Sequence, residues 1–191
     1  MALARKLATY EDTLAYPEGT RTEILAGEIL VQPGPSNEHQ YFQAGMSRRV
    51  GGPFGSDRTP GGWWILPDVD VRFTLHDVVR PDHSGWRRTR LASPFGKRPI
   101  DVIPDWICEI LSPSNFRHDR GRKSDLYAAH GVGHLWIVDP LERLLEAYAL
   151  MSGRWLRLGA YDDTVTARIP PFEAIELDVG ELFPPLDALP R

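Results

Sequence analysis

Apolar and polar residues follow two periods along this chain, and these periods separate the expected strands from the expected helices. Within residues 63–73, Val69 and Val71 alternate with Asp70 and Arg72. An alternation with a period of two is typical of a strand that buries one face and exposes the other. We therefore expect one strand over residues 63–73.

A second type of strand is expected at residues 106–111, where the chain is apolar at nearly every position. Pro104 precedes this run and Ser112-Pro113-Ser114 follows it, as turn residues do at the ends of a strand. A short continuous apolar run predicts a central strand that is buried on both faces.

Several shorter apolar segments predict further strands. They are Ile24-Leu25 and Ile29–Val31 as a hairpin, Val78–Arg80 ending at Pro81-Asp82, His134–Val138, and a β-meander over residues 144–150, 155–161 and 165–169.

Helices are expected at three places. Thr9 is placed to cap a short one, which Pro17 ends, and Asn37 to cap one that runs to about Val50. Asp119 is placed to cap a third, which runs to about His130 and ends at Gly131. Residues 51–62 and 84–101 are expected to be loops.

The order of these elements predicts an α+β fold with a mixed central sheet flanked by helices, an N-terminal hairpin and a C-terminal β-meander. A length of 191 residues predicts one domain over residues 1–191, with its core from about residue 9 to 180.

Composition adds limits on cellular location and chemistry. Cys108 is the one cysteine, so an intrachain disulfide and a cysteine-based zinc site are excluded. The basic pair Arg5-Lys6 is followed by only two apolar residues before polar ones begin at Thr9, so the apolar segment of a signal peptide is not present here. No uncharged apolar stretch approaches the roughly 18 residues needed to span a membrane. We expect a cytoplasmic protein that does not bind membranes.

The net charge of −4 argues against a protein that coats nucleic acid without specificity. Basic residues are nevertheless concentrated at 87–90, 97–98 and 117–123, where they could contact phosphates or form solvated loops. Trp86, within the expected basic loop, could stack on a base.

Glu109 lies in the middle of the buried strand, on the same face as Ile107 and Leu111. An isolated carboxylate in that position would cost several kcal/mol. The glutamate must therefore meet a cation, and a structural salt bridge, a lysine and a metal ion all remain open.

Lys123 is a candidate partner for Glu109. In the expected helix, Lys123, Leu126, Tyr127 and His130 share one face by the i, i+3, i+4, i+7 rule. Since this face carries apolar residues, we expect it to point toward the core and to bring the lysine near Glu109.

Asp82 ends an expected strand beside a loop, where a carboxylate is well placed to act as a ligand. Two carboxylates and an ammonium group at one point suit metal-assisted hydrolysis, with Mg²⁺ as a hard ion that prefers oxygen ligands. Two carboxylates could also serve a glycosidase, but the lysine and the basic loops favour a phosphate ester.

These residues belong to a longer pattern that resembles the Uma2 (DUF820) family of the PD-(D/E)XK nuclease superfamily. The pattern comprises Arg80-Pro81-Asp82, the segment from Pro104 to Asn115, the spacing from Asp119 to Tyr127, and the segment from Gly131 to Pro140. The resemblance extends over roughly residues 9–180. It implies a restriction-endonuclease-like core.

The resemblance also implies roles for individual residues. Asp82 and Glu109 match the metal-binding acids, but Leu111 stands where the family pattern has a lysine. Lys123 resembles the lysine that some members supply from the following helix instead. Glu23 is similar to a supporting acid of the superfamily. His39 and Gln40 are weaker candidates.

Two hypotheses about the function remain open. The first is a Mg²⁺-dependent endonuclease, with Mn²⁺ as a substitute, that acts on DNA as a homodimer. The second is a catalytically inactive module that binds nucleic acid or protein.

The sequence shows no histidine spacing of a zinc site, and Asp68 and Asp70 are expected to be solvated.

Overall fold

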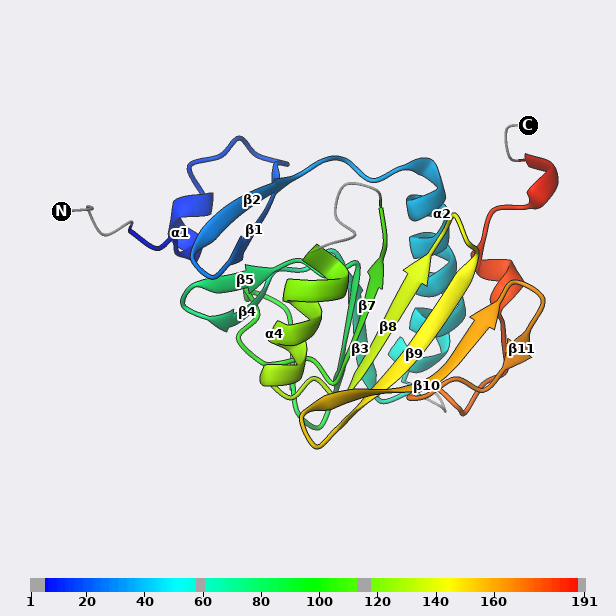
Figure 1. The fold of residues 1–191 in the computed structure, drawn as a ribbon. Helices are drawn as coiled ribbons and strands as arrows, with labels where there is room; N and C mark the ends of the chain where they lie inside the picture. The colour runs from blue at the N-terminus through cyan, green and yellow to red at the C-terminus, as the bar shows by residue number, and fades with distance from the viewer. Residues whose placement is uncertain (1–5, 58–60, 113–117, 189–191) are drawn as a thin grey trace.

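The computed structural model describes residues 6–57, 61–112 and 118–188, and its architecture is α+β with a large mixed sheet flanked by helices (Figure 1). The expected fold class is therefore confirmed. Among the described residues, none of the helices combines the length and the apolar character required to cross a bilayer.

The large sheet has six strands in the order β10-β9-β8-β7-β6-β3. Only β7 and β8 pair in parallel, and every other neighbouring pair is antiparallel. Its strands are β3 (Trp63–Pro67), β6 (His83–Arg87), β7 (Trp106–Ile110), β8 (His134–Asp139), β9 (Leu144–Met151) and β10 (Arg154–Asp162).

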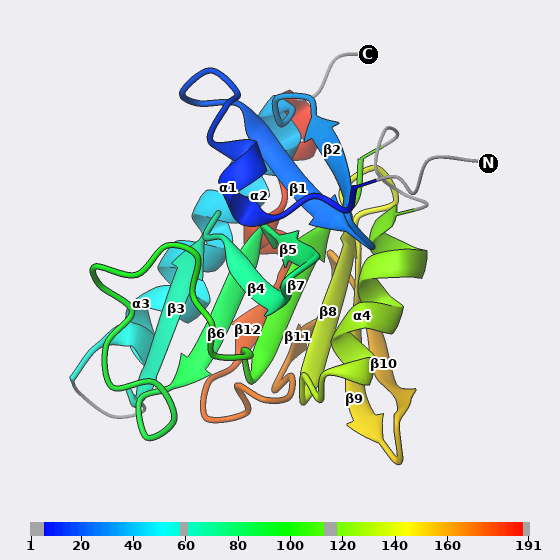
Figure 2. The same ribbon diagram turned by 90° about the vertical axis from the view of Figure 1, so that its left-hand side faces the viewer.

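Helical segments cover both faces of this sheet (Figures 1 and 2). One face is covered by α2 (Asn37–Met46), a π-helical segment (Ser47–Gly51) and α3 (Gly52–Gly55); the other by a π-helical segment (His118–Lys123) and α4 (Ser124–Ala129). Strand β7 is buried at all five positions because its residues alternate between the two faces. Trp106 and Cys108 pack toward α2, whereas Ile107 packs toward α4.

A smaller antiparallel sheet, in the order β2-β1-β5-β4, lies at the N-terminal side of the molecule (Figure 2). Its strands are β1 (Arg21–Leu25), β2 (Glu28–Gln32), β4 (Val71–Thr74) and β5 (Asp77–Val79), preceded by α1 (Tyr10–Thr13). Thr9 is the N-cap of α1 as expected, and it forms a capping box with Asp12.

Three of the expected boundaries were wrong. The strand expected at residues 63–73 is two strands in different sheets, because the chain turns at Asp68, which has a φ of 52°. The helix that starts at Asn37 continues through Gly51 to Gly55, since Val50 and Phe54 both insert into the core on that side.

The third wrong boundary is the loop expected at residues 84–101, which begins with strand β6 instead. Gly85 has no side chain to show an alternation, yet β6 lies between β3 and β7 and four of its residues are buried. A Cβ at Gly85 would lie 3.0 Å from Trp106 Cε3, so glycine permits the close approach of these strands.

The C-terminal meander is confirmed for β9 and β10 but not for its third strand. Strand β11 (Thr166–Ala167) pairs with β12 (Leu177–Asp178) in a separate two-stranded sheet. Two 3₁₀ turns follow, at Val179–Leu182 and Leu186–Ala188.

Some sequence-based expectations fall outside the described residues. Ser114 and Asn115 lie in the segment 113–117, and residues 1–5 are outside as well. The helix is described from His118 onward, and its capping by Asp119 is not covered by the described side chains.

Candidate functional site

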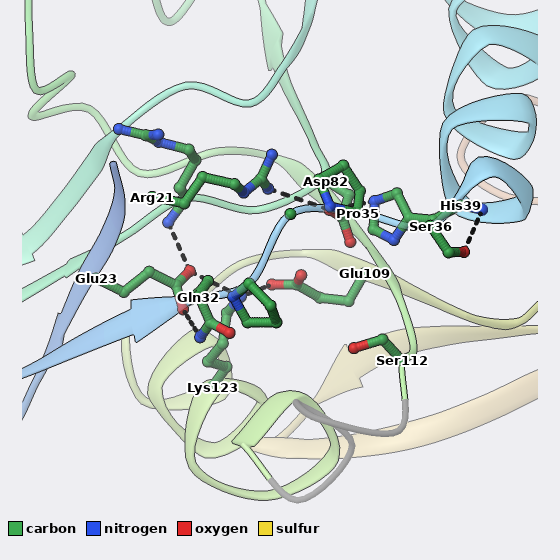
Figure 3. A pocket seen from close by; sticks show the side chains of 13 residues that line it. Arg21, Glu23, Gln32, Pro35, Ser36, His39, Asp82, Glu109, Ser112 and Lys123 are labelled. Atoms are coloured by element: carbon green, nitrogen blue, oxygen red, sulfur yellow. Dashed lines mark hydrogen bonds and ion pairs between the residues drawn. The ribbon is translucent and has the colours of Figure 1, made fainter. Parts of the chain in front are cut away.

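A cavity of about 210 Å³ lies where the small sheet meets the large one, and all four candidate site residues line it (Figure 3). Glu23 comes from β1, Asp82 directly precedes β6, Glu109 lies in β7 and Lys123 ends the π-helical segment before α4. Residues that are far apart in sequence thus converge on one point.

Lys123 is buried between two glutamates. Its Nζ lies 2.8 Å from Glu109 Oε1 and 3.0 Å from Glu23 Oε1, and its side chain is 3% exposed. The contact between Glu109 and Lys123 expected from the helix periodicity is present. The shared face is less regular than expected, because Leu126 and His130 are only partly buried whereas Lys123 and Tyr127 are fully buried.

Glu109 has a second donor in the hydroxyl group of Tyr127, which hydrogen-bonds Oε1. Burial, together with the negative charge of Glu109, raises the pKa of the Tyr127 hydroxyl well above its usual range. Tyr127 therefore keeps its proton and acts as a hydrogen-bond donor to the carboxylate.

The carboxylate of Glu23 is fixed by groups of the protein. Besides Lys123, it accepts hydrogen bonds from the backbone N–H of Arg80 at 2.8 Å and from Gln32 Nε2 at 3.0 Å. With both oxygens engaged in this way, Glu23 is suited to hold Lys123 in place. Gln32 was not identified from the sequence, since an amide in a hairpin strand has no distinguishing pattern.

Asp82 lies on the other side of the cavity and is 4% exposed. Its Oδ2 accepts the backbone N–H of Ile110 at 2.6 Å, and its Oδ1 is 2.9 Å from His39 Nε2 and 3.8 Å from an Arg21 nitrogen. Burial by itself would raise the pKa of Asp82. The contact with His39, the charge of Lys123 and the Ile110 N–H outweigh burial and hold the pKa below its usual value.

Of the two weaker candidates, the structure brings His39 to the cavity and leaves Gln40 exposed. The Ser36 hydroxyl accepts the N–H of His39 at 3.2 Å and fixes the first turn of α2. His39 Nε2 is close to Asp82 but poorly aligned for a hydrogen bond.

Two arginines of the site were missed by sequence reasoning. Arg21 and Arg80 both line the cavity, and Arg21 also pairs with Asp68 at 2.7 Å. Arg21 begins a strand of the small sheet, and no local pattern indicated that this sheet would reach the carboxylates of the large one.

The donor set fits a hard divalent ion. Asp82 and Glu109 supply carboxylate oxygens to one solvent-accessible cavity, and Mg²⁺ is usually held by one or two carboxylates while it keeps several waters. Within the described ranges, no three His, Cys, Asp or Glu side chains group closely enough to enclose a metal by themselves. This set is therefore suited to Mg²⁺ or Mn²⁺ rather than to a closed zinc site.

Two expectations about polar and aromatic residues were wrong. Asp70 is not solvated but 6% exposed, and it accepts hydrogen bonds from Arg80 Nε at 2.7 Å and Arg98 Nε at 2.9 Å. Trp86 is fully buried and donates to Val102 O at 2.8 Å, so it cannot stack on a base.

The arginines at the start of the expected basic loop contact their own chain. Arg87 lies over the Trp63 ring and Arg88 over the Trp64 ring, each at 4.2 Å from the ring centroid. Arg90 pairs with Asp105 at 2.7 Å. Arg87 ends β6 and the other two arginines follow it, so all three lie at the opposite end of the strand from Asp82.

Comparison with known proteins points in the same direction. The model of the Uma2 family, described as "Putative restriction endonuclease", matches residues 8–180. No curated protein matches the chain.

Among solved structures, one described as a "putative nuclease belonging to DUF820" from Anabaena variabilis is similar, with a TM-score of 0.73. It is 21% identical, and the match covers 92% of this chain and 97% of that one. At this level of identity the similarity shows a common fold.

Proposed function

Because the chain belongs to the Uma2 family of nuclease-like proteins, we propose that it is a metal-dependent endonuclease that hydrolyses DNA phosphodiester bonds. The observation that carries this proposal is the convergence of Asp82, Glu109 and Lys123 on one cavity. Two carboxylates and an ammonium group are the side chains that metal-assisted attack of water on a phosphate ester requires.

Asp82 and Glu109 are the residues that would hold Mg²⁺, with Mn²⁺ as a substitute. Bound there, the ion would stabilise charge on a phosphoryl oxygen and lower the pKa of the attacking water. The backbone N–H of Ile110 and the hydroxyl of Tyr127 keep the two carboxylates oriented toward the cavity before substrate binds.

Lys123 would stabilise the negative charge that develops on the phosphate, or orient the attacking water. Its ammonium group is already held by Glu23 and Glu109, so little rearrangement is needed during the reaction. Attack of water forms a new P–O bond and breaks the P–O bond to the leaving oxygen, which departs with a proton that the attacking water loses. Arg21 and Arg80 add positive charge at the edge of the same cavity.

The way in which the protein meets its substrate is also part of the proposal. A homodimer would place two sites on one duplex, one for each strand. The net charge of −4 means that attraction to DNA must come from local positive charge around the cavity rather than from the whole molecule.

A second candidate is supported by one specific observation. The ion pair of 2.8 Å between Lys123 and Glu109 could satisfy the buried carboxylate without any metal. In that case the protein would be a module that keeps the nuclease fold and binds nucleic acid or protein without cleaving it.

Cleavage of supercoiled plasmid distinguishes the two candidates. We expect nicking by the wild type with Mg²⁺ or Mn²⁺, no nicking with EDTA, and loss of nicking in Asp82→Asn and Glu109→Gln. Glu146→Gln is a matched control, because Glu146 is a buried acid in β9 that does not line the cavity. No cleavage of double- or single-stranded DNA by folded wild type would favour the binding module.

A further inference from the structure

A second cavity, of about 460 Å³, lies beside the candidate active site. Its apolar part includes Leu66 and Ile100, and its outer part includes Phe95, Lys97 and Arg98 from the segment that follows β6. Figure 2 shows this green segment running beside β3 toward β4, where Ile100 bridges Val71. The cavity therefore combines an apolar surface with positive charge.

The two cavities share a wall. Arg80 lines both, and Asp68 of the second cavity pairs with Arg21 of the first at 2.7 Å. The two cavities therefore adjoin each other at Arg80 and at the Arg21–Asp68 ion pair, which places the second cavity next to the one that holds Asp82 and Glu109.

Phe95 is the aromatic residue available for stacking in this cavity. Its side chain is 70% exposed, and its ring is in edge contact with Trp64 at 5.6 Å between centroids. An edge contact orients the ring and leaves a face free. Exposed aromatic rings beside positive charge are what single-stranded nucleic acids use for base stacking.

The charges around the cavity favour an anion. Asp70 binds both Arg80 and Arg98, and Arg98 is still 72% exposed. The hydrogen bond and the negative charge of Asp70 raise the pKa of Arg98, so its guanidinium stays charged. Lys97 is exposed and has no ion-pair partner in the described part of the chain. Since Asp68 is paired with Arg21, three cations face one remaining acid.

We propose that this second cavity binds an unstacked nucleotide next to the phosphodiester to be cleaved, with its base on Phe95 and its phosphate at Lys97 and Arg98. This inference rests on the proposed function and adds a substrate class to it. Because bases in a duplex are stacked on one another, the cavity selects single-stranded or locally opened DNA.

The test is binding of short fluorescent oligonucleotides, single-stranded and duplex, measured by anisotropy in EDTA so that no cleavage occurs. Phe95→Ala should weaken single-strand binding about tenfold and leave duplex binding unchanged. Phe95→Trp should retain binding. Leu141→Ala, at a residue that is 76% exposed in the turn after β8, is the matched control and should bind as the wild type does.

The inference is overturned if Phe95→Ala binds the single strand as tightly as Leu141→Ala does, or if the wild type binds neither oligonucleotide. If the wild type cleaves plasmid but Phe95→Ala binds the single strand as tightly as the wild type, the proposed nuclease activity is supported and the nucleotide site is not. If Phe95→Ala weakens single-strand binding but the wild type does not cleave DNA, the nucleotide site is supported and the nuclease activity is not.

Discussion

Lys123 is held between Glu109, a proposed metal ligand, and Glu23, whose carboxylate is committed to protein donors. The two glutamates therefore differ in role although both touch the same ammonium group. In the proposed site, Glu109 would share its charge between Lys123 and a metal, whereas Glu23 would position Lys123.

This difference predicts the effect of removing the charge of Glu23. Glu23→Gln should lower the cleavage rate by about 10- to 100-fold while leaving Mn²⁺ affinity close to that of the wild type, because Lys123 loses an anchor but the metal keeps its ligands. Glu146→Gln is the control for loss of a buried acid. Equal losses of metal affinity in Glu23→Gln and Glu109→Gln would contradict the assignment of roles.

His83 supplies a prediction about pH. Burial, opposed in part by Asp82 and Asp68, lowers its pKa to about 4 from the usual 6.5. Because the unfolded chain binds the proton below pH 6.5 and the folded chain does not, stability is lost as the pH falls from about 6.5 to 4.

Urea unfolding in EDTA checks this prediction. The free energy of unfolding should fall by about 2–3 kcal/mol between pH 7 and 4.5 through this residue. His83→Gln should reduce the fall by that amount. A variant with the same pH dependence as the wild type would show that His83 is not responsible.

The site residues that could be predicted from the sequence lie in strands and helices with a clear period of apolar positions. Glu109 interrupts an apolar run and Lys123 lies on an apolar helix face, so each carried a local signal. His39 was a weaker candidate, whereas Arg21 and Gln32 were missed; all three reach the cavity through tertiary packing of the small sheet and α2. Their positions depend on how distant elements pack together, which no local pattern encodes.

At the level of elements, β6 shows why one strand could not be predicted. Its sequence, His83 to Arg87, lacks apolar alternation and contains a glycine, and it becomes a strand because β3 and β7 pair with it on either side. By contrast, β7, β8, β9 and β10 were predictable, since their apolar patterns are local.

The packing of β6 gives a stability prediction. Gly85→Ala should destabilise the protein by about 1–3 kcal/mol, because the added Cβ would lie 3.0 Å from the Trp106 ring. Gly52→Ala is the matched control, since nothing lies within 4 Å of a Cβ there. Equal stability of both variants in urea unfolding would contradict the tight packing of β6 against β7.

At the level of the whole molecule, the candidate site is assembled by two sheets and two helical segments. The small sheet supplies Glu23 and Arg21, the large sheet supplies Glu109, and the segment that joins the two supplies Asp82. An ion bound at this junction would connect elements that otherwise meet through buried ion pairs. Its binding would therefore stabilise the folded molecule as a whole.

In the proposed site, Asp82 and Glu109 hold a divalent ion although Lys123 already contacts Glu109. Calorimetric titration of the metal-free protein with Mn²⁺ tests it most directly, with Asp82→Asn, Glu109→Gln and Glu146→Gln alongside. We predict that the wild type and Glu146→Gln bind the ion and that the two site variants do not. Absence of Mn²⁺ binding by folded wild type, or equal binding by all four proteins, would contradict the claim.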